Sequence, residues 1–318
     1  MIPVKNGVGR LECCLDSLAR QLYPRDHVEV IVADGRSSDA TRAVAESRGA
    51  IVVHNPKELV AAGRNVGFQH ARGDIVAFTD DDCTFPEDWL DRAAIHFADP
   101  CVAGLGGPTR MPADESHFGR AVALLFELGV RAAGSVHAEK VEARRMVSDL
   151  PGCNMFYRRA VLEQVMPVIE TLVTAEDVEL GFRLREAGFH LFTVPDVSVW
   201  HHKRPTPRRF FRQMYRFAIG RLQVGRRHAG ALRPVHVAAG LAMPATVLLL
   251  PLAVIGLPIL ALILFAMGLV RTGSPAVAIR FPIVVIGGVF AWSAGFMREL
   301  ASPLPTDEQQ FDWSGHAG

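Results

Sequence analysis

The amino-acid sequence predicts an α/β domain with a mostly parallel sheet, followed by apolar helices toward the C-terminal end. Between Ile2 and Phe78, short apolar runs alternate with segments of helical periodicity, the pattern of βαβ units. Three aspartates follow Phe78 directly, and open α/β sheets bind their ligands at the carboxyl ends of strands. Residues 235–270 contain no Lys, Arg, Asp or Glu, which indicates an apolar surrounding for that segment.

The expected elements of the α/β domain follow one another in a regular order. Short apolar runs predict strands over residues 2–4, 28–33, 51–54, 74–78, 103–109 and 191–199. Helical periodicity predicts helices over residues 11–22, 40–48, 59–70, 120–133 and 177–187, the last closed by Gly188. We therefore place this domain over residues 1–202.

Charge separates this domain from the segment that follows. Residues 1–202 hold 21 Lys and Arg against 29 Asp and Glu, whereas residues 203–233 hold ten basic residues and no acid. An acidic domain argues against nucleic acid as a partner, because phosphate contacts need positive charge on the docking face. Residues 203–233 instead predict a basic amphipathic helix at an anionic membrane surface. One helical face carries Phe210, Met214 and Phe217, with Arg209, Arg212 and Arg216 nearby.

Apolar segments predict two or three transmembrane helices over residues 234–298. A span needs about 20 apolar residues, and Pro251, Gly256 and Pro258 divide the run 235–270 into two short spans or a re-entrant hairpin. A third candidate covers residues 281–297, and residues 299–318 form a polar tail. Because basic flanks stay inside, we expect a multi-pass protein of the inner (cytoplasmic) membrane with its α/β domain in the cytoplasm. The alternative is a buried helical hairpin of a soluble domain.

The five cysteines are odd in number and show no CxxC spacing, so they indicate neither a disulfide framework nor a zinc site. A reducing cytosol is the simplest setting for them. Met1 leads directly into an apolar run, so we expect no signal peptide.

The aspartate triplet is the strongest local signal for chemistry. Asp80 and Asp82 stand at i and i+2 behind a buried strand, where two carboxylates can be aimed at one divalent cation and its bound phosphates. Hard cations such as Mg²⁺ and Mn²⁺ prefer such oxygen ligands.

The order of motifs over about residues 1–225 resembles glycosyltransferase family 2, in its membrane-anchored bacterial type. The matching segments are residues 2–6 (opening strand), 33–41 (nucleotide turn), 64–67, 80–82 (DxD element), 152–155, and Glu176-Asp177 followed by Leu180 and Arg183. The resemblance implies a Rossmann-like GT-A fold. It also implies hexosyl transfer from a nucleoside-diphosphate sugar to an acceptor hydroxyl, with inversion and with Mn²⁺ or Mg²⁺ as cofactor.

The resemblance assigns one set of residues to the donor. Asp80 and Asp82 would hold the metal and Arg64 would lie near the diphosphate, because the leaving group's negative charge must be stabilised. The other donor-side residues would be Pro3, Asp34 and Asp81. His201 would join the metal, and strand alternation favours it over His202. Asp39 more simply caps the helix expected near Ala40.

A second set of residues is assigned to the acceptor. Asp177 matches the general base that a single displacement requires. The acceptor side would also include Gly152, Asn154, Glu176, Gln213 and Arg216. The last two stand in a segment that resembles the QxxRW element of processive relatives, but Phe217 replaces the tryptophan.

Two other functions fit part of the pattern. A nucleotidyltransferase can share the sheet and metal site, but residues 7–10 resemble its Gly-rich loop only weakly. A non-catalytic membrane scaffold would not need the metal ligands and base. For a transferase, the membrane helices favour a lipid-linked sugar, a lipid or a surface polysaccharide as acceptor, with membrane lipids as further partners.

Overall fold

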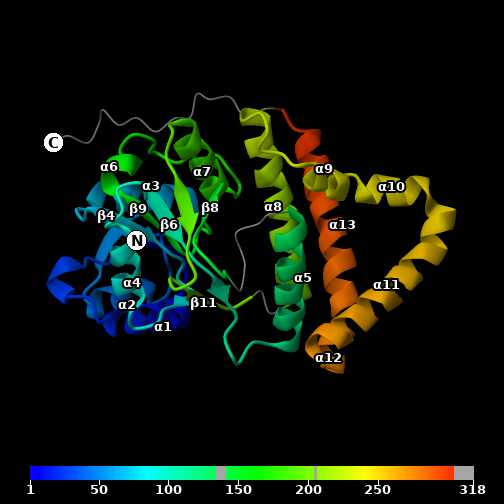
Figure 1. Cartoon of the computed structure of the whole chain (residues 1–318), viewed down its shortest axis with the longest axis horizontal. Coiled ribbons are helices and arrows are strands. Elements are labelled where there is room, and N and C mark those ends of the chain that lie inside the picture. Colours follow the sequence, from blue (N-terminus) through cyan, green and yellow to red (C-terminus); the bar gives the residue numbers. More distant parts are fainter. Residues whose placement is uncertain (134–140, 204–205, 304–318) are drawn as a thin grey trace.

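The computed structural model describes residues 1–133, 141–203 and 206–303, which form an α/β domain beside a group of long helices (Figure 1). The first half of the domain is a parallel sheet in the order β1-β2-β3, as the βαβ pattern predicts. Its strands are β1 (Ile2–Val4), β2 (Ile31–Asp34) and β3 (Ile51–His54). Its helices are α1 (Val8–Ala19), η1 (Arg25–His27), α2 (Thr41–Ser47) and α3 (Val60–His70).

The second half of the sheet is mixed rather than parallel. Its five strands run in the order β4-β9-β6-β10-β8, and β9 is antiparallel to both β4 and β6. The bounds are β4 (Ile75–Phe78), β6 (Gly104–Gly106), β8 (Arg145–Val147), β9 (Met155–Arg158) and β10 (Leu191–Thr193). Backbone hydrogen bonds from the Met1 nitrogen to Ala77 (2.8 Å) and from Thr79 to Met1 (3.1 Å) place β1 beside β4 and join the two halves.

The run 191–199, expected as one strand, is broken into two. β10 ends at Thr193, and β11 (Val199–His201) belongs to a small third sheet with β5 (Cys83–Thr84) and β7 (Thr109–Arg110). Pro195 and Asp196 lie in the turn between them, where the Asp196 carboxylate contacts His96 at 3.0 Å. The break carries the chain from the main sheet to the aspartate triplet. The remaining helices of the domain are α4 (Trp89–His96), α6 (Arg159–Leu162) and α7 (Glu176–Glu186).

Apolar residues on both faces of the sheet form the core. One cluster includes Ile2, Leu11 and Phe156, and a second includes Phe78, Tyr157 and Leu180, all buried. Because both faces are covered, the central strands are apolar throughout rather than alternating.

The helical part packs its long helices side by side against the α/β domain (Figure 1). Its members are α5 (His117–Ala133), α8 (Pro207–Arg227), α9 (Pro234–Gly240), α10 (Ala242–Leu248), α11 (Leu250–Thr272), α12 (Pro275–Ala278) and α13 (Phe281–Leu300). On α8, Phe210 and Met214 are buried in a cluster with Phe118 of α5 and Phe281 of α13. The face that we expected against lipid is therefore covered by protein, because α5 and α13 offer matching apolar faces.

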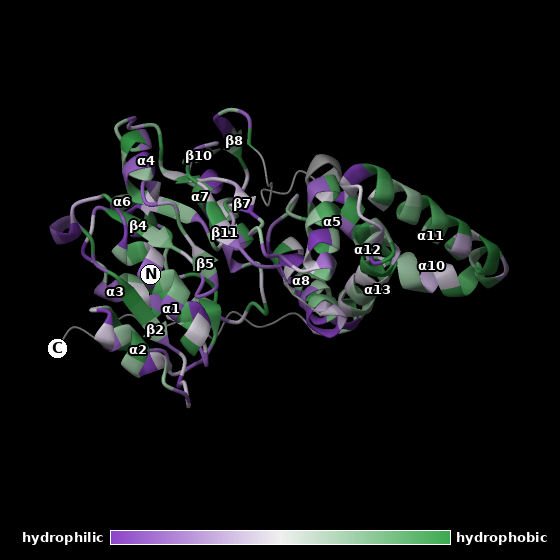
Figure 2. Ribbon diagram, turned by 90° about the horizontal axis from the view of Figure 1, so that it is seen from below, coloured by the Kyte–Doolittle hydropathy of each residue, from purple (hydrophilic) through white to green (hydrophobic). Residues whose placement is uncertain are grey.

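The uncharged run does not form two equal short spans. It forms the short helices α9 and α10 and then α11, which continues through Pro258. Leu250–Thr272 and Pro275–Leu300 are long and apolar enough to cross a membrane, judged by length and composition alone. In Figure 2 most of α11 has the apolar colour. Beyond α13, the acidic residues Asp307, Glu308 and Asp312 of the expected polar tail lie outside the described residues.

Candidate active site

The fold brings together the three predicted metal ligands. Asp80 and Asp82 follow β4, and His201 ends β11, which pairs with the short strand after the triplet. One ligand atom from each residue lies within 4.8 Å of those of the other two. We call Asp80, Asp82 and His201 together the carboxylate group, after its two aspartates. His201 Nε2 lies 3.0 Å from Asp82 Oδ1, whereas His202 is more than half exposed, so the favoured histidine is the one that points inward.

Electrostatics of the carboxylate group suit a cation. Burial raises the pKa of Asp80 to about 7, although the charge of Arg64 opposes this shift. Burial lowers the pKa of His201, but the charge of Asp82 and the interactions with Asp82 and Cys153 as hydrogen-bond partners together outweigh burial and raise this pKa to about 10. The metal-free site thus pairs a protonated His201 with Asp82, at a position where two carboxylates and one ring nitrogen also fit Mn²⁺ or Mg²⁺.

Arg64 joins the carboxylate group to the predicted acceptor side. Its side chain rises from α3 and is buried, with Nη2 3.6 Å from Asp80 and Nη1 2.5 Å from Glu176. Nη2 also donates to the carbonyl of Gly152 at 3.1 Å. Burial and the neighbouring Asp177 charge raise the pKa of Glu176, although Arg64 opposes this. One guanidinium therefore contacts residues of both predicted sets.

Asp177, the predicted base, lies in the first turn of α7. Its carboxylate accepts from the backbone N–H of Gly152 at 3.0 Å and from that of Val178 at 2.8 Å. A Cβ at position 152 would lie 2.6 Å from Arg64 Nη2 and 3.2 Å from Asp177 Oδ2, so glycine alone fits between them. Gly152 thereby fixes the spacing between Arg64 and Asp177.

The middle aspartate of the triplet points elsewhere. Asp81 Oδ2 accepts from Arg10 Nη2 at 2.7 Å and from its Nε at 3.1 Å, which ties the triplet to the start of α1. A Cβ at Gly7 would collide with the same oxygen, so the loop after β1 lies directly against Asp81. Contact of Asp81 with a nucleotide stays a prediction.

The predicted nucleotide turn is held by its own side chains. Asp34 is buried at the end of β2 and accepts from the N–H of Ser37 at 3.2 Å. Asn6, after β1, accepts from the N–H of Ser38 at 2.8 Å, so the two loops are tied together. The N-cap residue of α2 is Ala40 rather than Asp39, and Asp39 accepts from the N–H of Thr41 at 3.0 Å from one position earlier.

Two predicted site residues have their side chains in the interior. Pro3 is buried in β1 and lies so close to α3 that a Cβ on Gly63 would come within 2.9 Å of it. Asn154 is fully buried, donates to the carbonyl of Val197 at 2.8 Å and accepts from Trp89 at 3.2 Å. These contacts give both residues packing roles and leave the amide of Asn154 already paired, so its assignment to the acceptor has no support from its position.

On α8, Arg216 ties the helix to the segment before α7. Arg216 donates to the carbonyl of Val173 at 3.2 Å and receives at its own carbonyl the hydroxyl of Thr174 at 3.0 Å. Gln213 is half-buried one turn earlier, and its contact with a substrate stays a prediction. Gln223, which the sequence did not single out, accepts from the N–H of Val173 at 3.1 Å. α8 thus holds the segment that leads into Asp177.

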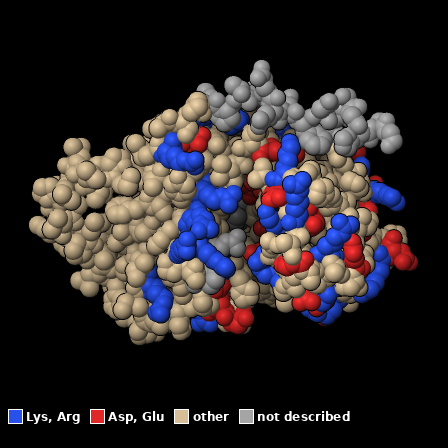
Figure 3. All heavy atoms as spheres, turned by 180° about the vertical axis from the view of Figure 1, so that it is seen from behind, with Lys and Arg blue, Asp and Glu red and all other residues tan. Residues whose placement is uncertain are grey.

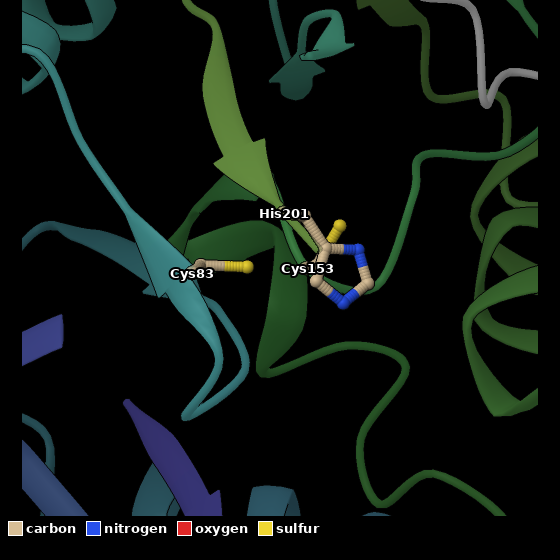
Figure 4. A group of neighbouring side chains, drawn as sticks. All are labelled: Cys83, Cys153 and His201. Carbon is tan, nitrogen blue, oxygen red and sulfur yellow. The ribbon is translucent and has the colours of Figure 1, made fainter. Parts of the chain in front are cut away.

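Sequence reasoning also missed Arg10, Cys83 and Cys153. Arg10 stands in the short Gly-rich segment after β1, residues 7–10, and this segment was a signal by which Arg10 could have been found. The two cysteines are 70 positions apart in the chain, and only the fold brings them together beside His201 (Figure 4).

Comparison with known proteins agrees with this geometry. A family model described as glycosyl transferase family 2 matches residues 1–166. The chain is 27% identical over 252 residues to the glycosyltransferase AglE of Haloferax volcanii, with 75% of this chain and 77% of that protein covered. It is 25% identical over 322 residues to the succinoglycan biosynthesis protein ExoA of Rhizobium meliloti, with 94% of each covered.

Solved structures show the same fold. The mannosyltransferase PcManGT from Pyrobaculum calidifontis, in complex with GDP-Man and Mn²⁺, superposes with a TM-score of 0.65 at 24% identity. That likeness covers 94% of this chain and 86% of the other. Staphylococcus aureus TarS 1-349 in complex with UDP gives a TM-score of 0.52 at 17% identity, with 93% and 89% covered. Since the family model spans more than half of the sequence and the GT-A fold is shared, the chain belongs to glycosyltransferase family 2.

Proposed function

We propose that the chain is an inverting, metal-dependent transferase that moves a hexosyl group from a nucleoside-diphosphate sugar to an acceptor hydroxyl at the cytoplasmic membrane face. The observation that carries the proposal is the position of Arg64, with the carboxylate group on one side and Glu176 and Asp177 on the other. A donor diphosphate bound at the carboxylate group and an acceptor hydroxyl beside Glu176 and Asp177 would then lie on opposite sides of this guanidinium.

On the donor side, Asp80, Asp82 and His201 would hold Mn²⁺ or Mg²⁺, whose charge stabilises the departing nucleoside diphosphate. Arg64 supplies a fixed positive charge in a buried site, where electrostatic stabilisation is stronger than in water. Asp34 would bind the base or ribose at the turn after β2.

On the acceptor side, Asp177 would take the proton of the acceptor hydroxyl as the new bond to the anomeric carbon forms and the bond to the diphosphate breaks. Its two backbone hydrogen bonds hold the carboxylate in one orientation. One displacement of this kind inverts the anomeric configuration. Glu176 and Arg216 border the same segment.

Two similar proteins support a nucleotide-sugar donor and a saccharide acceptor. PcManGT is described in complex with GDP-Man and Mn²⁺, and ExoA is named for succinoglycan biosynthesis. We infer the same two classes for this chain, a nucleotide-sugar donor and a saccharide acceptor.

We further propose that α10 and α11 enter the membrane as a re-entrant hairpin. α13 packs along α8, which carries seven arginines between Pro207 and Arg227. If α13 crossed the bilayer, α8 would place arginines near its centre at a cost of about 2.5–3.5 kcal/mol each. The side-by-side packing therefore favours α8 and α13 lying along the surface, in agreement with the band of basic side chains beside the mostly uncharged part of the molecule in Figure 3.

The corner between α10 and α11 is the part that would reach deepest. Val247, Leu248 and Leu252 are 69%, 82% and 68% exposed at this corner, and Figure 1 shows it pointing away from the rest of the molecule. The hairpin returns to the protein at both ends, because Met243 donates to Ser293 of α13 at 3.0 Å and Leu264 packs in the cluster with Phe281. Such a path keeps Arg271 and Arg280 on the cytoplasmic side.

Transfer assays with a panel of sugar nucleotides test the reaction. We expect turnover to need Mn²⁺ or Mg²⁺ and Asp82→Ala to lower it by at least about 100-fold. Asp177→Asn should keep donor and metal binding while transfer collapses, since an amide cannot take the proton. Full activity in EDTA would contradict the metal assignment, and parallel loss of donor binding in Asp177→Asn would make Asp177 a donor-site residue. A folded wild-type chain that transfers no sugar would favour the scaffold alternative.

Membrane extraction tests the hairpin. Leu248→Asp should release the protein at lower salt or detergent, whereas Ile95→Asp, at an apolar position 71% exposed in the α/β domain, should not. Reporter fusions after Thr272 and at Gly318 should both give cytoplasmic signals. An external signal at either position would support crossing helices, and extraction of the wild-type protein by salt alone would refute membrane insertion.

A further inference from the structure

Two thiols lie directly beside the carboxylate group. Cys83 in β5 and Cys153 in the loop before β9 are both buried, and each lies next to His201 (Figure 4). One ligand atom from each of the three residues falls within 4.8 Å of the other two. We call Cys83, Cys153 and His201 together the thiol group, after its two cysteines. His201 therefore belongs to both the thiol group and the carboxylate group.

The backbone around the thiol group is fixed from several directions. Cys83 and His201 are opposite partners in the antiparallel pair of β5 and β11. The carbonyl of Cys153 accepts from the hydroxyl of Thr79 at 2.8 Å, and the hydroxyl of Thr109 lies 3.7 Å from its sulfur. The three ligands therefore come from separate segments that the fold holds in place.

This set of donors suits a different cation from the one expected at the carboxylate group. Two thiolates and one imidazole favour Zn²⁺ and other thiophilic ions, whereas Mg²⁺ and Mn²⁺ favour oxygen. Tetrahedral Zn²⁺ with bonds of about 2.3 Å to sulfur and about 2.0 Å to nitrogen has ligand atoms roughly 3.5–3.8 Å apart. The observed limit of 4.8 Å thus requires movements of only about 1 Å, within reach of side-chain rotation.

We propose that Cys83, Cys153 and His201 form a binding site for a thiophilic divalent cation such as Zn²⁺, and that this cation excludes the catalytic one. The exclusion rests on the proposed function, because it follows from the sharing of His201. With His201 bound to Zn²⁺, the carboxylate group keeps only Asp80 and Asp82, and a second divalent charge would lie a few ångströms away. Binding of Zn²⁺ releases three protons to solvent, two from the thiols and one from the imidazolium of His201.

Binding is tested on the full wild-type chain with Co²⁺ and Zn²⁺ alone as probes, in the absence of any sugar nucleotide. Co²⁺ should produce thiolate-to-metal charge-transfer absorption at one equivalent, and Zn²⁺ should abolish it. X-ray absorption of the Zn²⁺-loaded chain should show two sulfur neighbours at about 2.3 Å together with nitrogen or oxygen neighbours. Absence of sulfur from the metal shell of the wild-type protein would overturn the proposal without requiring any variant to fold.

Variants assign the thiols. Cys83→Ala and Cys153→Ala should each lose the charge-transfer absorption, whereas the double variant Cys13→Ala/Cys101→Ala, at exposed thiols, should keep it. If the double variant lost the charge-transfer absorption and the single variants kept it, surface thiols would be binding the Co²⁺ probe, and the proposed site would be wrong.

The exclusion of the catalytic cation by Zn²⁺ is measured separately, through the rate of transfer. Equimolar Zn²⁺ should lower Mn²⁺-dependent transfer at least tenfold in the wild type, and much less in Cys153→Ala relative to that variant's own zinc-free rate. Sulfur ligation together with unchanged transfer would refute exclusion. Sulfur ligation in a chain that transfers no sugar with Mn²⁺ would instead contradict the proposed function and leave the binding site intact.

Discussion

Substitution of Gly152 by alanine tests the central geometry of the site. The N–H of Gly152 donates to Asp177 at 3.0 Å, and its carbonyl accepts from Arg64 at 3.1 Å. The new Cβ would lie 2.6 Å from Arg64 Nη2, where ordinary contacts begin at 3.4 Å. Arg64 is 2% exposed and held by Glu176, so it has little room to withdraw.

The size of the effect follows from this overlap. Relief of the contact needs a shift of about 1 Å, and a misplacement of that size can cost about 100-fold in rate. Overpacking of a filled site lowers the free energy of unfolding by about 1–3 kcal/mol. We therefore expect Gly152→Ala to lower kcat/KM for transfer by about 100-fold, with a destabilisation that still leaves the chain folded at 25 °C.

The assay combines transfer kinetics, donor binding and chemical denaturation. Gly129→Ala on α5 is the matched control, because a Cβ there meets nothing within 4 Å. It should leave transfer unchanged and should stabilise the helix by up to about 1 kcal/mol. Gly152→Ala with wild-type kcat/KM would show that the spacing between Arg64 and Asp177 is irrelevant to transfer.

Two further predictions concern the protonation of Asp80 and the hydrogen bond between Gln223 and Val173. Because burial raises the pKa of Asp80 from its ordinary 3.8 to about 7, the metal-free folded chain retains a proton that the unfolded chain has lost between these values. In EDTA the free energy of unfolding should therefore fall as pH rises through that window, while Mn²⁺ affinity should rise; pH-independent Mn²⁺ affinity in titrations would contradict this. Gln223→Leu removes the acceptor for the N–H of Val173 and should cost about 1–3 kcal/mol of stability. Transfer should fall with donor binding unchanged, and wild-type transfer would show that this bond does not position Asp177.

The first half of the fold could be predicted because its local signals agree with one another. The strands β1 to β4 are short apolar runs bounded by polar turns, and each is joined to the next by a helix of recognisable period. The aspartate triplet could be placed at a strand end from the sequence alone. The local role of Asp39 at the start of α2 could be predicted to within one residue, because it needs only an N–H two positions further along the chain.

Other features depend on contacts between distant segments. β9 inserts antiparallel between β4 and β6, and no local pattern reveals a strand's direction. The apolar face of α8 is the same whether lipid or α13 covers it, so its periodicity could not distinguish the two. The thiol group has no CxxC spacing, because its members come from three separate segments. The interior role of Asn154 likewise depends on Trp89 and Val197, which only the fold supplies.

The contact between α8 and the segment before α7 has a consequence for how the enzyme is studied. A Cβ on Gly220 would lie 2.3 Å from the carbonyl of Thr174, so the two backbones touch, and Gln223 and Arg216 bind the preceding Val173. A tilt of α8 would therefore be passed directly to the start of the helix that carries Asp177. Lipids that support α8 would then set the rate constant of the chemical step, and turnover in nanodiscs of anionic lipid should exceed turnover in detergent at equal donor occupancy.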